Sequence, residues 1–188
     1  MERSIKERNV TEIDAKLNSI GSYLIKIEYL ETALKNNFTS DIKKFILEKL
    51  TALYEENKMF GKAGKLFCDR AMMETGIKGK VDNFLKAAEC YSKAGNIENA
   101  EQMFIRALRD ANSEQQKGIR LATKNIYMAS AKELEKRGLR NLSMKMYEKL
   151  ITLPSLNDIE KNEIKEKLRS TYKALGKFSE LKLLEGIK

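Results

Sequence analysis

Apolar side chains recur along this chain at intervals of three or four residues, the spacing of one face of an α-helix. The clearest stretch covers residues 84–108, where a Gly-Asn pair separates two such stripes and predicts a turn. The positions that form the stripes and the turn are Phe84, Ala88, Tyr91, Gly95, Ala100, Phe104 and Ala107. Because large residues face small ones, the two helices can pack closely, and the pattern predicts an antiparallel helix pair.

The same pattern recurs before and after residues 84–108. Gly138 and Gly176 are equivalent to Gly95 downstream, and Lys58 takes the place of the glycine upstream. The core positions of these further units are Tyr54, Ala63, Phe67, Tyr127, Ala131, Tyr147 and Tyr172. The four turn positions lie about 37, 43 and 38 residues apart, and we expect the extra residues to lengthen the first helix of the third unit. A helix pair cannot cover its apolar stripe alone, so the repetition predicts a stack of pairs.

This pattern predicts one all-α domain, residues 1–188, with about nine helices arranged as stacked antiparallel pairs. The expected repeat units span residues 42–78, 80–112, 115–155 and 157–188. Ahead of them, residues 10–41 are expected to form an N-terminal capping helix. Its stripe consists of Ile13, Leu17, Ile20, Leu24 and Ile27, which continue at helical spacing and predict a single long helix.

The unit at residues 84–108 resembles a tetratricopeptide repeat, whose signature places small residues and aromatics at these offsets. The other units match in part, since Ser143 and Leu150 stand where alanines are expected, and Leu181 and Glu185 also depart from the pattern. The resemblance covers roughly residues 42–188, and the longer spacing is also similar to arrays of soluble NSF attachment proteins. It implies a right-handed α-α superhelix whose first helices line a concave groove. A non-repeating helical bundle with one regular unit is the alternative.

Tetratricopeptide-like arrays bind proteins in their groove, so the resemblance implies a protein–protein interaction adaptor or scaffold. The groove candidates lie on the faces of the first helices that remain once the core stripes are assigned: Glu48, Glu55, Leu85, Glu89, Ser92, Met128, Lys132, Glu135, Glu166 and Lys173. This surface is mixed and fairly polar. It lacks the Lys and Asn pairs with which some chaperone-binding relatives grip a terminal carboxylate. Simple solvation of these side chains is the alternative interpretation.

The residues present exclude several classes of chemistry. The sequence contains no histidine, which removes the commonest general base and a common metal ligand. Cys68 and Cys90 are too far apart for a C-x-x-C site, and no glycine loop for phosphate binding is present. We therefore expect a non-catalytic protein without a cofactor or a metal site. No run of about 18 apolar residues occurs, and residues 1–16 are charged, so we expect a cytoplasmic protein without a membrane span.

Positive charge is concentrated in the second half of the chain. The net charge is +9, and residues 101–150 carry eleven basic and six acidic side chains. The basic-patch candidates are Lys117, Arg120, Lys124, Lys136, Arg137, Arg140, Lys145 and Lys149. Such a patch attracts phosphates, which makes an RNA- or ribosome-associated factor the alternative function, and a solvated basic face remains the plainer explanation. Apolar surface on the terminal helices would also allow a homodimer.

Overall fold

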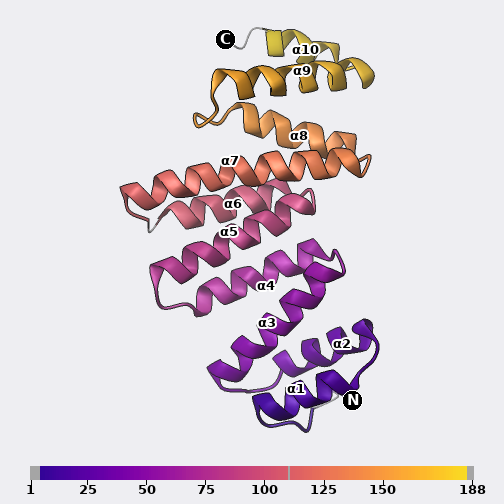
Figure 1. Cartoon of the computed structure of the whole chain (residues 1–188), viewed down its shortest axis with the longest axis vertical. Helices are drawn as coiled ribbons and strands as arrows, with labels where there is room; N and C mark the ends of the chain where they lie inside the picture. Colours follow the sequence, from indigo (N-terminus) through magenta and orange to yellow (C-terminus); the bar gives the residue numbers. More distant parts are fainter. Residues whose placement is uncertain (1–4, 110, 186–188) are drawn as a thin grey trace.

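The computed structural model describes residues 5–109 and 111–185, which form ten helices and no strand. The helices are α1 (Val10–Ser19), α2 (Tyr23–Leu34), α3 (Ser40–Glu56), α4 (Phe60–Met73), α5 (Ile77–Lys93), α6 (Ile97–Arg109), α7 (Ser113–Lys136), α8 (Arg140–Ile151), α9 (Asp158–Ala174) and α10 (Phe178–Glu185). They stack in chain order from α1 at one end to α10 at the other (Figure 1). From α2 onward each helix packs against the next in sequence, and α5 also packs against α7. The prediction of an all-α fold is confirmed.

Four of the interhelical turns share one backbone geometry. Lys58, Gly95, Gly138 and Gly176 have positive φ angles of 56°, 76°, 74° and 67°. At each turn, the next residue donates its N–H to a carbonyl in the last turn of the preceding helix: Met59 to Tyr54 (2.8 Å), Asn96 to Tyr91 (2.8 Å), Leu139 to Leu134 (2.9 Å) and Lys177 to Tyr172 (2.9 Å). These bonds satisfy carbonyls that a helix end leaves unpaired. The same turn therefore joins α3 to α4, α5 to α6, α7 to α8 and α9 to α10.

The predicted stripes form the core of the stack. The expected aromatics and alanines of all four units are buried, except Tyr91, which is half-buried. Phe104 of α6 meets Tyr127 of α7 edge to face, with ring centroids 5.2 Å apart. Tyr91 lies over Gly64 of α4, where an added Cβ would come within 3.1 Å of its ring. Small residues thus allow aromatic rings on one helix to approach the next helix closely.

The N-terminal segment departs from the single capping helix that the stripe predicts. Residues 20–22 interrupt it, so that it forms α1 and α2, and the described residues contain ten helices rather than nine. Ile20 and Ser22 adopt extended backbone conformations on either side of Gly21. Beyond the break the stripe faces the core only in part, because Ile27 is buried whereas the side chain of Leu24 is 58% exposed.

The extra residues of the third unit lie in α7, as expected. This helix has 24 residues, whereas α3, α5 and α9 have 17 each. It begins at a capping box in which Asn112 and Gln115 exchange side-chain and backbone hydrogen bonds of 2.9 Å. Asn157 and Glu160 form the same arrangement at the start of α9. These caps define where the two helices begin.

Candidate functional site

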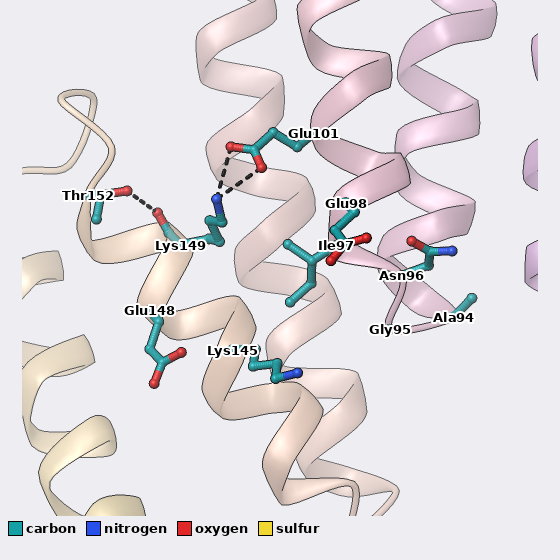
Figure 2. Close-up of a pocket in the computed structure, with 10 residues that line it drawn as sticks. All are labelled: Ala94, Gly95, Asn96, Ile97, Glu98, Glu101, Lys145, Glu148, Lys149 and Thr152. Atoms are coloured by element: carbon teal, nitrogen blue, oxygen red, sulfur yellow. Dashed lines mark hydrogen bonds and ion pairs between the residues drawn. The ribbon is translucent and has the colours of Figure 1, made fainter. Parts of the chain in front are cut away.

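A cleft of about 830 Å³ lies between α6 and α8 (Figure 2). Its wall on the α6 side is formed by the Gly95 turn and the first turns of the helix, and its wall on the α8 side by one helical face. The lining side chains that carry polar groups are Asn96, Glu98, Glu101, Lys145, Glu148, Lys149 and Thr152. Glu98 and Glu101 are three residues apart, and Lys145 and Lys149 are four apart, so each pair shares a face of its helix.

One ion pair links the two walls of the cleft. The Lys149 ammonium lies 2.9 and 3.0 Å from the two carboxylate oxygens of Glu101 (Figure 2). Both side chains are more than two-fifths exposed, so the pair contributes at most about 1 kcal/mol to stability. The Tyr172 hydroxyl of α9 donates to Glu148 at 2.8 Å, and burial raises the pKa of this tyrosine. Two walls held by a weak ion pair can exchange it for a charged ligand.

A second, apolar hollow of about 210 Å³ adjoins this cleft and shares Glu101, Lys149 and Thr152 with it. Its remaining wall is mostly apolar, formed by α6, α7 and the segment after α8: Phe104, Ile105, Leu108, Tyr127, Leu153 and Pro154. Burial, and then the charge of Glu101, raises the pKa of Tyr127 to about 12. The two hollows form one depression along α6, charged near its start and apolar near its end.

The side chains of this depression can pair with charges, form hydrogen bonds and contact apolar groups. Its groups are carboxylates, ammonium groups, the Arg120 guanidinium, the Asn96 amide, several hydroxyls and apolar side chains. Within residues 5–109 and 111–185, no group of three or more Cys, Asp or Glu side chains is placed to hold a metal ion. Both cysteines are free thiols outside the cleft. Burial raises the pKa of Cys90 to about 12, the opposite of the shift that activates a nucleophilic thiol.

One predicted groove residue is misplaced. Ser92 is fully buried, and its hydroxyl has no hydrogen-bond partner among the described residues. It lies on α5, which packs against α4, α6 and α7 and is therefore covered on more than one face. The prediction assumed a single buried stripe for this helix. A small residue is needed at position 92 because a neighbouring helix covers it, and Ser92 is not part of a groove.

The other groove candidates lie on the surface, but many of them interact within the chain. Glu48, Glu55, Lys132, Glu135, Glu166 and Lys173 are exposed, and Leu85, Glu89 and Met128 are half-buried. Glu89 pairs with Lys93, and Glu166 pairs with Arg169. Glu135 accepts from Tyr147 at 3.1 Å and from Lys167 at 2.9 Å, and these contacts, Lys167 first, lower its pKa. Three carboxylates on this face therefore already have partners.

The structure divides the predicted basic patch. Lys124 pairs with Glu160 at 2.8 Å, Lys117 with Glu114, and Lys149 with Glu101, so the charge of these lysines is compensated. The Arg137 guanidinium donates to the Lys93 carbonyl at 3.1 Å. The remaining members, which form no ion pair with a described residue, are Arg120, Lys136, Arg140 and Lys145. Arg120 borders the apolar hollow, and Lys145 borders the cleft. The basic residues that remain together at the turn between α7 and α8 are therefore Lys136, Arg137 and Arg140.

Sequence reasoning missed the acidic members of the cleft, Glu98, Glu101 and Glu148. Their spacing is that of ordinary solvated helix faces, and it indicates a site only once α8 is seen to lie opposite α6.

In the part of the chain that the structure describes, no helix combines the length and the apolar character needed to cross a bilayer. Comparison with protein-family models, curated proteins and solved structures finds no match to this chain.

Proposed function

We propose that this protein is a non-catalytic, tetratricopeptide-like scaffold of the cytoplasm that binds a segment of a partner protein. The four turns with matching φ angles and matching hydrogen bonds support the repeat interpretation, because they follow every second helix from α3 to α9 at similar intervals of about 37, 43 and 38 residues. The small residues buried at equivalent positions support it as well. Stacked helix pairs provide rigid extended surfaces, which suit the binding of chain segments.

The observation that carries the proposal is the depression along α6. Its charged cleft and its apolar hollow meet at Glu101 and Lys149, so an extended segment with both charged and apolar side chains would fit along it. Lys145 and Glu98 form no ion pair with a described residue, so they offer a cation and an anion to a ligand. The face of the first helices is the weaker candidate, because Glu89, Glu135 and Glu166 are paired within the chain.

A charge exchange tests the cleft. The tagged protein is purified from its native cell, and co-purifying proteins are quantified by mass spectrometry for the wild type and for Glu98→Lys/Lys145→Glu. The matched control is Glu48→Lys/Lys132→Glu, which exchanges the same charges on exposed positions of α3 and α7. We expect the cleft variant to lose its partner and the control to keep it. A partner that is retained by the cleft variant and lost by the control would assign binding to the first helices and refute the cleft.

The alternative is docking on RNA or on a ribosome through Lys136, Arg137 and Arg140. The exposure of all three side chains around one turn favours it. It predicts cosedimentation with ribosomal particles that is sensitive to ribonuclease and lost in Arg137→Glu/Arg140→Glu. Cosedimentation that changes neither with salt nor with these substitutions would exclude RNA docking.

A homodimer is supported by the exposed Phe178 and Leu183 of α10. A monomer in light scattering at micromolar concentration would contradict the homodimer.

A further inference from the structure

A separate hollow with basic walls lies between α4, α5 and α6, closer to the N-terminus than the α6–α8 cleft. It measures about 350 Å³ and is lined by Met72 of α4, Lys80 and Phe84 of α5, and Arg106 and Arg109 of α6. Arg106 and Arg109 are three residues apart and share a face of α6. Met72 is 71% exposed, whereas Phe84 is only 7% exposed. Three cations therefore surround a partly apolar depression.

The cations of this hollow have no partner among the described residues. Lys80, Arg106 and Arg109 form no ion pair, although nine such pairs are found elsewhere in the described chain. The acidic residues of α4 and of the segment after it are Asp69 and Glu74. Asp69 is influenced mainly by burial and by Lys65, and Glu74 lies against Gly79 at the start of α5. Neither carboxylate neutralises the cluster.

The corresponding place between α6 and α8 shows why Arg106 forms no ion pair with a described residue. Arg106 precedes Lys149 by the same interval that separates Gly95 from Gly138, so the two cations occupy equivalent places in successive units. At the later junction Lys149 is neutralised by Glu101 of α6. The position on α4 equivalent to Glu101 is Gly64, whose missing side chain makes room for the Tyr91 ring. Close packing at Gly64 has thus removed the carboxylate that would compensate Arg106.

We infer that Lys80, Arg106 and Arg109 form a binding site for an acidic peptide segment that carries an apolar side chain. Arginine guanidinium groups bind carboxylates through paired hydrogen bonds, and Met72 provides an adaptable apolar contact beside them. The nearly covered Phe84 ring offers no face on which a nucleobase could stack, which disfavours RNA. This inference deepens the proposed scaffold function, on which it rests, by assigning a partner chemistry to a junction outside the α6–α8 cleft.

Fluorescence anisotropy with defined peptides tests the site on the full chain. The probe is a fluorescein-labelled peptide in which aspartates and glutamates flank a leucine. In two companion peptides, either the acids are changed to amides or the leucine is changed to serine. We expect Arg106→Gln/Arg109→Gln to weaken binding of the acidic probe by about tenfold or more. Met72→Ser should weaken binding of the leucine peptide but not of the serine peptide.

The matched control is Lys136→Gln/Arg140→Gln, which removes two exposed cations at the turn between α7 and α8. It should change the affinity by less than about twofold, because the overall field of the protein contributes little at moderate salt. Equal weakening by both double variants, or undiminished binding of the amide peptide, would overturn the site. Failure of the wild type to bind the acidic probe would do the same. Arginine-dependent binding of single-stranded polyuridylate in place of the peptide would reassign the site to RNA and also reject the inference.

The two sites can fail separately. The Glu98→Lys/Lys145→Glu variant changes the cleft and leaves the basic hollow intact, so we expect it to bind the acidic probe like the wild type. Loss of the cellular partner in that variant with retention of the probe would support both sites. Probe binding that is lost in the cleft variant and kept in Arg106→Gln/Arg109→Gln would overturn the basic hollow and place the acidic segment in the cleft.

Discussion

Replacing Gly95 with alanine tests the turn geometry and the approach of α8 at the same time. Gly95 has a φ of 76°, and an added Cβ would lie 2.6 Å from the Cδ1 atom of Leu142. Gly138 has nearly the same φ, 74°, but no atom lies within 4 Å of its added Cβ. Gly138→Ala therefore isolates the backbone cost, whereas Gly95→Ala adds the contact with Leu142.

The expected loss of stability has a backbone contribution at both glycines and a contact contribution at Gly95 alone. The left-handed conformation costs a residue with a Cβ about 1–2 kcal/mol, and the reduced freedom of the unfolded chain offsets about 0.4–1 kcal/mol of that. We therefore expect Gly138→Ala to lower the free energy of unfolding by about 1 kcal/mol. At Gly95 the end of the Leu142 side chain must also leave its preferred rotamer, which costs about 0.5–1.5 kcal/mol more. The expected loss for Gly95→Ala is about 2 kcal/mol.

Equilibrium urea denaturation followed by far-ultraviolet circular dichroism measures these losses. The variants are Gly95→Ala, Gly138→Ala and Leu142→Ala, together with the two double variants that combine each glycine replacement with Leu142→Ala. A double-mutant cycle then gives the coupling between Leu142 and each glycine. We expect a coupling of about 1 kcal/mol at Gly95 and none at Gly138. Equal losses for the two glycine variants, or a gap that persists in the Leu142→Ala background, would refute the close approach of α8.

Three further predictions concern other positions. Lys58→Gly should raise the free energy of unfolding by about 0.5–1 kcal/mol in the same urea assay, because Lys58 holds a left-handed φ of 56°, and a loss would contradict the turn equivalence. Ser92→Ala should raise it by about 1 kcal/mol, since the buried hydroxyl has no partner; destabilisation would reveal a hydrogen bond. Lys124 lowers the pKa of Glu160 below its ordinary 4.5, so this pair stabilises the fold above pH 4.5 and the contribution is lost as the pH falls through the lowered pKa. Lys124→Met should therefore destabilise at about pH 7 and be nearly neutral at about pH 2 in urea melts at both values, and an equal effect at the two would rule out the charge as the cause.

Local spacing was sufficient to predict much of the fold. The helix pairs, the turns at Gly95, Gly138 and Gly176, and the equivalence of Lys58 with these glycines follow from residues close together in sequence. Helical periodicity and the φ preference of glycine act within one or two turns, so one sequence reveals them. Periodicity did not predict the break around Gly21, because the stripe continues at helical spacing although the backbone is extended at Ile20 and Ser22.

Burial of individual positions was predictable only along the apolar stripe of a helix. Phe84 and Ala88 belong to such a stripe and are buried as expected. Ser92 lies on a helix with three neighbouring helices, and sequence periodicity does not report how many neighbours a helix has. Its small hydroxyl-bearing side chain is compatible with either a surface or a tight interface, so composition provided no signal.

The sequence by itself determined the helices, their turns and the aromatic and small residues between them, because those depend on backbone preferences and on periodicity. Only the tertiary structure decided which surfaces can bind. It placed Glu101 against Lys149, 48 residues away, and it left Arg106 without an ion pair to any described residue, because Gly64 stands where the equivalent carboxylate would be. Charges interact through space over a few ångströms, and helix stacking sets those distances. Of two basic side chains at equivalent positions, Lys149 is therefore compensated, whereas Arg106 forms no ion pair with a described residue.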